Sequence, residues 1–196
     1  QAKDLTAQLL TFSKGGRPVK SAVALAPIVH DSVALAARGG SARCVVNFPG
    51  DLWPVEADPA QVSQVFNNLL LNAQQAMPQG GEITITGRNR SGGELNEPLL
   101  QPGRYVEVTL RDQGVGISPE ALPRIFDPYF TTKQSGSGLG LAVVHSIISQ
   151  HRGVIKAASQ IGQGTTFTLW LPATATVPKT PAQTGPPAPP RPPRIL

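Results

Sequence analysis

The chain has 196 residues, of which 40% are hydrophobic, so it is long enough to bury the core of one globular domain. The net charge of +5 is uneven: the Pro-rich segment 173–196 holds three basic residues and no acid, which leaves +2 elsewhere and argues against nucleic acid as a partner. A single cysteine, Cys44, excludes an internal disulfide or a cysteine cluster for metal, and no apolar run approaches the roughly 20 residues of a membrane helix.

The first part of the chain contains signals for two helices and a strand. Apolar residues recur at helical spacing over 5–12, which predicts a short amphipathic helix that the glycine pair 15–16 ends. A second helix is predicted over 27–38, because Pro27 suits a first turn and two glycines follow the segment. Apolar and polar residues alternate over 44–48, which predicts a strand.

Residues 58–77 carry both start and stop signals of a helix. Asp58 can cap the first turn, Pro59 suits the first helical position, and Gln61 stands where a capping box has Glu or Gln. The helix is expected to end near Met77, because a Pro-Gln-Gly-Gly turn follows it.

The remaining elements complete one domain. Alternation predicts strands over 82–87, 105–112, 154–159 and 165–171, with a polar loop over 89–103 and a mostly apolar helix over 138–151. One mixed sheet with helices packed on one face accounts for this order. The predicted fold class is therefore α+β, a two-layer α/β sandwich.

Polar side chains form a stripe along the helix predicted over 58–77. Gln64, Asn68 and Asn72 stand four residues apart, so they share one face of the helix. Amide oxygens are neutral, hard ligands that suit Mg²⁺ when it also binds phosphates. A solvated helix face gives the same pattern, and so short a motif often arises by chance.

Asp112 stands at the end of a predicted strand. It has the parity of the apolar residues in that strand, so its carboxylate points toward the core side. A carboxylate directed inward needs hydrogen-bond donors in place of water, and the exocyclic amine of adenine is one such donor. Gly114 and Gly116 permit a tight turn and a close approach to a ligand. An ordinary turn after a strand is the alternative interpretation.

Two further glycine-rich segments follow. The sequence GSGLGL (136–141) opens a helix, where exposed N–H groups and the helix dipole favour an anion such as a triphosphate. Lys133 could add a point charge beside it. A flexible loop is the alternative for this segment, and 162–166 by itself indicates only a turn.

Five segments resemble, in the same order, the motifs of one ATPase superfamily. They are NNLLLNAQQAM (67–77), DQGVGIS (112–118), IFDPYFTTK (125–133), GSGLGLAVVHSIISQHRG (136–153) and GQGTTFTLWLP (162–172). The superfamily comprises histidine kinases, DNA gyrase, the large heat-shock chaperone and mismatch-repair ATPases. The F box (125–133) and the GLGL form are similar to those of histidine kinases, and LLTFSKGG (9–16) resembles the end of a dimerisation helix in nitrogen-regulator-type sensor kinases.

The resemblance implies a site for ATP and Mg²⁺. Asn72 is expected to be the main Mg²⁺ ligand with Asn68 assisting, and these two residues with Lys133 form the expected catalytic set. Asp112 is expected to bind the adenine amine, and Thr165 to help hold the adenine through its hydroxyl. The other expected nucleotide-binding residues are Gly114, Gly116, Phe130, Gly136, Gly138, Leu139 and Gly140.

The resemblance also implies a lid, and it leaves His30 as a weak candidate for a phospho-acceptor. Phe126, Tyr129 and Phe130 are expected to anchor a lid over 128–138. None of the three histidines carries a complete phospho-acceptor motif: His30 precedes an aspartate without the rest of the motif, and the other two, His145 and His151, are expected to pack or face solvent.

The implied function is that of a protein histidine kinase in a two-component phosphorelay. Residues 17–172 are expected to transfer the ATP γ-phosphate to a histidine on a dimerisation hairpin, of which 1–16 is the truncated end. The expected partners are that hairpin, a homodimeric second copy and a response regulator or receiver domain, in the cytoplasm. The segment 173–196 is expected to be a linker, either to a receiver domain or to no recognisable domain.

Alone, the chain is expected to be monomeric and unable to phosphorylate itself, because it lacks the acceptor hairpin. Two alternatives remain open at this point: a chaperone or topoisomerase relative that hydrolyses ATP, and a nucleotide-sensing interaction module without transfer activity.

Overall fold

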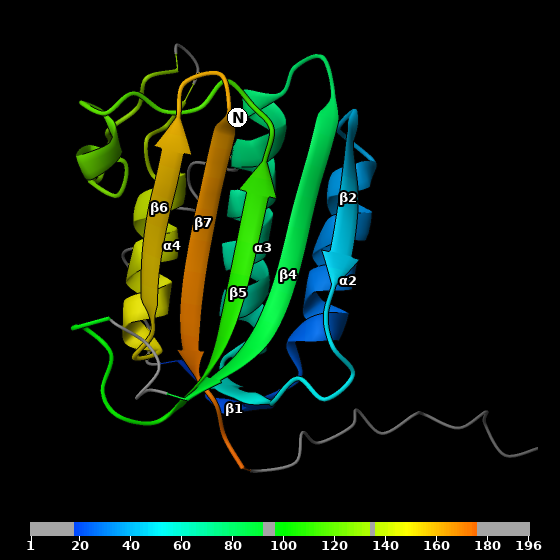
Figure 1. Ribbon diagram of the computed structural model, residues 1–196, viewed down its shortest axis with the longest axis vertical. Coiled ribbons are helices and arrows are strands. Elements are labelled where there is room, and N and C mark those ends of the chain that lie inside the picture. Colours follow the sequence, from blue (N-terminus) through cyan, green and yellow to red (C-terminus); the bar gives the residue numbers. More distant parts are fainter. Residues whose placement is uncertain (1–17, 92–96, 134–135, 176–196) are drawn as a thin grey trace, which may run out of the picture.

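The computed structural model describes residues 18–91, 97–133 and 136–175. The elements in chain order are β1 (Ser21–Val23), α2 (Leu25–Ala37), β2 (Ala42–Asn47), β3 (Val55–Ala57), α3 (Pro59–Ala76), β4 (Gly81–Ser91), β5 (Arg104–Asp112), the short 3-10 helix η2 (Leu122–Arg124), α4 (Gly140–Gln150), β6 (Val154–Gln160) and β7 (Gly164–Pro172). Figure 1 shows α2, α3 and α4 together behind one face of the larger sheet. The predicted two-layer α+β sandwich is confirmed.

The larger sheet is mixed. Its five strands follow the order β2-β4-β5-β7-β6, in which β2 runs parallel to β4 and every other pair is antiparallel. Strands β1 and β3 pair separately as a small antiparallel sheet. These two strands were not predicted, because segments of three residues are too short to display an alternating pattern.

The core lies between the sheet and the three helices. In β4 and β5, every second residue turns toward the helices, and the apolar members of this set are fully buried. The residues that α3 buries against them are Val62, Val65, Phe66, Leu69, Leu70 and Ala73. Because burial of a large apolar side chain contributes about 1.5–3 kcal/mol, this helix is held mainly by packing.

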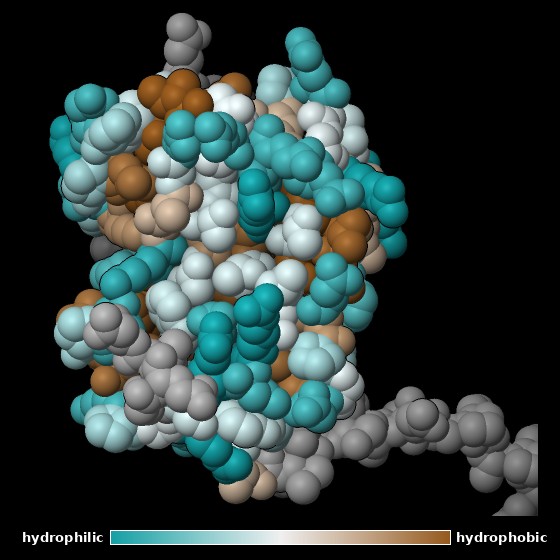
Figure 2. Space-filling view, in the orientation of Figure 1, coloured by the Kyte–Doolittle hydropathy of each residue, from teal (hydrophilic) through white to brown (hydrophobic). Residues whose placement is uncertain are grey.

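The other face of the sheet is open to solvent. Figure 2 views the molecule from that side, where neutral and hydrophilic residues dominate the centre. Threonines supply much of this surface, since β-branched polar residues suit a half-buried pleated face. They are Thr84, Thr86, Thr109, Thr166 and Thr168.

The start of α3 differs in one respect from the predicted capping box. Asp58 caps the helix as expected, because its Oδ1 accepts from the backbone N–H groups of Ala60 (3.0 Å) and Gln61 (3.2 Å). The predicted reciprocal bond, in which the Gln61 side chain accepts from the Asp58 N–H, does not form. That N–H donates instead to Nε2 of His151 at 2.9 Å. A buried imidazole from the end of α4 therefore completes the N-terminus of α3.

Three element boundaries also differ from the predictions. Helix α2 starts at Leu25, because the first turn needs no N–H from Pro27 and so accommodates it. Strand β4 continues to Ser91, where ladder pairing with β5 outweighs the polar composition of 89–91. Helix α4 starts at Gly140, because Gly138 has φ +68° and cannot belong to a right-handed helix.

Within the described residues, no helix is long and apolar enough to cross a bilayer. The predicted helix over 5–12 and nearly all of the predicted linker lie outside the described residues.

Candidate nucleotide-binding site

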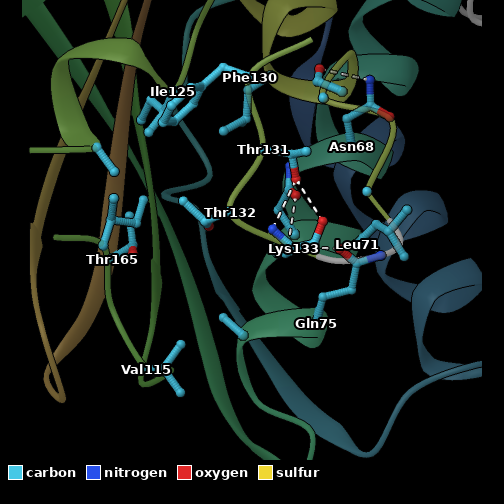
Figure 3. A pocket seen from close by; sticks show the side chains of 18 of the residues that line it. Asn68, Leu71, Gln75, Val115, Ile125, Phe130, Thr131, Thr132, Lys133 and Thr165 are labelled. Carbon is cyan, nitrogen blue, oxygen red and sulfur yellow. Dashed lines mark hydrogen bonds between the residues drawn. The ribbon is translucent and has the colours of Figure 1, made fainter.

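A pocket of about 900 Å³ opens between α3, the start of α4 and the loops at one end of the sheet. Figure 3 shows side chains from these elements converging on it. Ten of the twelve predicted site residues line it: Asn68, Asn72, Asp112, Gly116, Phe130, Lys133, Gly136, Gly138, Gly140 and Thr165. The other two lie behind its wall, since Leu139 is buried in the core and Gly114 packs against Ala76.

Asp112 lies at the floor of the pocket with only 2% of its surface exposed. Its Oδ1 accepts two backbone hydrogen bonds, from Gly114 N–H at 2.8 Å and Thr165 N–H at 3.2 Å. Burial raises the pKa of this carboxyl, and the two amides and the Lys133 charge act in the opposite direction. Within the described residues nothing bonds to Oδ2, which leaves that oxygen to accept from a ligand.

Two glycine turns interlock beside Asp112. Gly116 and Gly164 have φ values of +74° and +91°, which side-chain-bearing residues rarely adopt. A Cβ at Gly116 would lie 2.1 Å from the Gln160 carbonyl oxygen, and one at Gly164 would lie 2.0 Å from the Asp112 carbonyl oxygen. The turns therefore approach so closely that only glycine fits, and together they form one wall of the pocket.

The amides of Asn68 and Asn72 lie on the face of α3 that borders the pocket, as the four-residue spacing predicted. Asn68 donates from Nδ2 to the Gly140 carbonyl at 3.3 Å, which joins α3 to the start of α4. Gln64, the third member of the predicted stripe, does not line the pocket. Gln75 does, and sequence reasoning missed it because it lies one turn beyond Asn72 at the three-residue spacing that a helix also places on one face.

Lys133 joins the segment above the pocket to α3. Its ammonium donates to Oδ1 of Asn72 at 3.3 Å and to Oε1 of Gln75 at 2.7 Å (Figure 3). Loss of surrounding water lowers the pKa of Lys133, and the negative charge of Asp112 opposes that shift. The two carboxamide oxygens thus already hold a cation at this side of the pocket.

The loop before α4 is closed at its base. The Tyr129 N–H donates to the Gly138 carbonyl at 2.9 Å, and a Cβ at Gly138 would lie 2.4 Å from the Tyr129 carbonyl carbon. Helix α4 then begins at Gly140 with its first N–H groups and the positive end of its dipole at the pocket. This geometry suits a bound phosphate.

The F-box aromatics differ in what they contact. The Phe126 ring lies 5.4 Å from the His145 ring on α4, and the Arg124 guanidinium lies 4.6 Å from the centre of the Phe130 ring. Tyr129 is 69% exposed, so its backbone rather than its ring fastens the loop. Phe126 and Phe130 therefore make the ring contacts of this segment, and the anchoring of a lid stays a prediction.

The three histidines lie apart from the pocket lining. His30 is exposed on α2, and His145 is exposed on α4. His151 is 1% exposed and joins α4 to α3, so its role is in packing.

Taken together, the sandwich and its pocket suit a nucleotide, because a buried carboxylate, interlocked glycine turns, amide side chains on a helix and a second helix start surround one cavity. The family model described as "Histidine kinase-, DNA gyrase B-, and HSP90-like ATPase" matches residues 57–175, and the chain belongs to this family.

The relatives within the family are sensor histidine kinases. The chain is 40% identical over 179 residues to sensor kinase CckA of Brucella abortus (88% of this chain, 19% of the relative). It is 39% identical over 175 residues to sensor histidine kinase ZraS of Escherichia coli K12 (88% of this chain, 35% of the relative). The solved catalytic domain of histidine kinase ThkA superposes with a TM-score of 0.65 at 27% identity, covering 79% of this chain and 95% of that one.

These matches identify the chain as an ATP-binding catalytic domain of the sensor histidine kinase type. The chain spans about a fifth to a third of the length of these two curated relatives.

Proposed function

We propose that residues 17–172 bind Mg·ATP and transfer its γ-phosphate to a histidine on a separate dimerisation hairpin. The observation that carries this proposal is the convergence of Asp112, Asn72 and the start of α4 on one pocket of about 900 Å³. Thr165, whose N–H donates to Asp112, and Lys133, which bridges to Asn72, lie on different sides of the pocket (Figure 3). This polarity matches a ligand with a base at one end and a polyphosphate at the other.

In this proposal Asp112 accepts a hydrogen bond from the exocyclic amine of adenine through Oδ2. Its Oδ1 is already engaged by two backbone amides, which hold the carboxylate in place. Thr165 borders the same region, and apolar residues such as Ile125 and Phe167 line the pocket beside them. These residues orient the base and exclude water from it.

The donor set at the other end fits Mg²⁺. Asn72 and Gln75 already place their oxygens around the Lys133 ammonium, so their dipoles favour a cation there. We infer that Asn72, with Asn68 one turn earlier, would hold the metal, which supplies charge neutralisation on the phosphates. Lys133 and the N–H groups at the start of α4 would hold the remaining phosphate charge.

Transfer needs no covalent chemistry from these residues. A phosphoryl group moves in line between a leaving and an attacking atom, so the domain positions ATP and stabilises charge while the acceptor histidine attacks. None of the histidines in the described residues lines the pocket. The acceptor is therefore proposed to belong to the dimerisation hairpin of a homodimeric parent protein, and a response regulator or receiver domain to accept the phosphoryl group next.

We also propose the surrounding organisation from the sequence resemblance. Residues 1–16 are the end of a dimerisation helix, and residues 173–196 are a linker. A cytoplasmic location accords with sensor kinase relatives and an ATP substrate.

Phosphotransfer to a supplied hairpin tests the proposal. The chain is incubated with a dimerisation hairpin from a sensor kinase and radiolabelled ATP, and acid-labile phosphate on the hairpin is measured. Asp112→Asn and Asn72→Ala should abolish the signal, and Asp127→Asn, a change at an exposed carboxylate that does not line the pocket, should leave it unchanged. ATP binding without transfer to any hairpin would instead support a nucleotide-sensing module.

A further inference from the structure

Ser159 is a half-buried residue on β6 that does not line the pocket, yet its hydroxyl joins two segments that border the pocket. Its Oγ accepts from the Ile117 N–H at 2.8 Å, on the loop that follows Asp112. It lies 2.9 Å from the Gly164 carbonyl oxygen and 2.9 Å from Oγ1 of Thr165, on the turn that leads into β7. One side chain thus connects both glycine turns.

The number of protons in this cluster determines the direction of each hydrogen bond. A serine hydroxyl has one proton and two lone pairs. The Gly164 carbonyl can only accept, so the single Ser159 proton is directed to it. Ser159 then accepts from the Ile117 N–H and from the Thr165 hydroxyl, which uses both lone pairs.

Thr165 consequently donates its only hydroxyl proton to Ser159 and presents only lone pairs to a ligand. Its backbone N–H is also committed, since it donates to Oδ1 of Asp112. The Asp112 carboxylate is itself an acceptor without a proton. Asp112 and Thr165 are therefore both hydrogen-bond acceptors toward a ligand.

We propose that Ser159 is a positioning residue that holds the Thr165 hydroxyl as an acceptor and so selects purines with an amino group at position 6. A 6-amino group offers two N–H donors to these acceptors. A 6-oxo purine, such as hypoxanthine or guanine, offers these acceptors a single donor, its N1–H, and its oxo group presents lone pairs to the lone pairs of the other acceptor. A binding site built from two acceptors disfavours such a base because one of its polar groups loses its partner. This inference rests on the proposed placement of the base near Asp112.

Calorimetric titration of the full chain with ADP and with IDP tests the proposal, because the two nucleotides differ at position 6. In Ser159→Ala the Thr165 proton is released and can turn toward an oxo group. The ADP:IDP affinity ratio should therefore fall by about threefold to tenfold, the range of one neutral hydrogen bond. Ser159→Cys retains the size with a weak donor and should shift the ratio in the same direction if the alanine variant folds poorly. Thr166→Val, on the opposite face of β7, is the matched control and should leave the ratio unchanged.

A double-mutant cycle distinguishes an effect of Ser159 through the Thr165 hydroxyl from a structural role that affects both nucleotides equally. If Ser159 acts through Thr165, the ratio in Ser159→Ala/Thr165→Val should equal that in Thr165→Val alone. An ADP:IDP affinity ratio that stays unchanged in Ser159→Ala, whether both affinities fall equally or neither changes, would overturn the positioning role. The proposed function is tested separately by Asp112→Asn: an unchanged ADP affinity in that variant refutes the placement of the base, whatever Ser159 does.

Discussion

Asp112→Asn tests the pocket assignment most directly, because the structure determines which atom of the new side chain faces the ligand. The Gly114 and Thr165 N–H groups both donate to Oδ1 of Asp112, at 2.8 and 3.2 Å. An asparagine must turn its single oxygen toward those two donors, since the opposite orientation places N–H against N–H. Its amide nitrogen then replaces Oδ2 and offers donors to the adenine amine, which is itself a donor.

The expected loss follows from this single hydrogen bond. A hydrogen bond to a charged group is worth about 1.5–3 kcal/mol, and the variant replaces it with an unpaired contact. At about 1.4 kcal/mol per factor of ten, ADP and ATP should both bind about tenfold to a hundredfold more weakly. The backbone contacts of the side chain survive, so the melting temperature without nucleotide should change little.

Titration calorimetry with ADP measures the affinity, and thermal unfolding confirms that the variant is folded. Asp127→Asn makes the same chemical change at an exposed carboxylate that lies 3.7 Å from Arg124, and it should bind ADP like the parent chain. Equal affinity in Asp112→Asn and the parent chain would show that the base does not bind at this carboxylate.

Three further predictions concern the metal ligand, the lid and the fold. Asn72→Ala should reduce phosphotransfer far more than ADP affinity, because the base contacts remain while the phosphates lose a ligand, and unchanged transfer would exclude Asn72 as a metal ligand. Backbone amides over 131–138 should exchange hydrogen more slowly with Mg·ATP than without it, and exchange that ignores ATP would contradict a lid. Burial lowers the pKa of His151 below its ordinary value of 6.5, although its hydrogen bond to the Ile147 carbonyl acts the other way. His151 therefore takes up a proton more readily in the unfolded chain than in the folded chain. The free energy of unfolding should consequently fall as the pH drops below about 6.5. When thermal unfolding is measured from pH 5 to 8, the melting temperature of His151→Asn should depend less on pH than that of the parent chain. The control variant His145→Asn should show the same pH dependence as the parent chain.

The sequence by itself determined the fold class, the long helices and most of the pocket lining. Asp112 illustrates why: its parity in β5 could be counted from the apolar residues before it, and the structure places it with them at 2% exposure. Asn68 and Asn72 likewise share a face because helical spacing requires it. Periodicity is a local property, so it can be read without knowing what packs against the element.

Only the tertiary structure decided which groups from distant segments meet. Gln61 had the right position for a capping box, but His151, 93 residues from Asp58, takes the N–H that Gln61 was expected to accept from. Gln75 became part of the site because the loop from the F box carries Lys133 across to it. Ser159 lies in a strand with an ordinary alternating pattern, and its three contacts on two separate loops arise only when β5, β6 and β7 align. Such contacts depend on the register and packing of elements far apart in the chain, and no local pattern in the sequence records them.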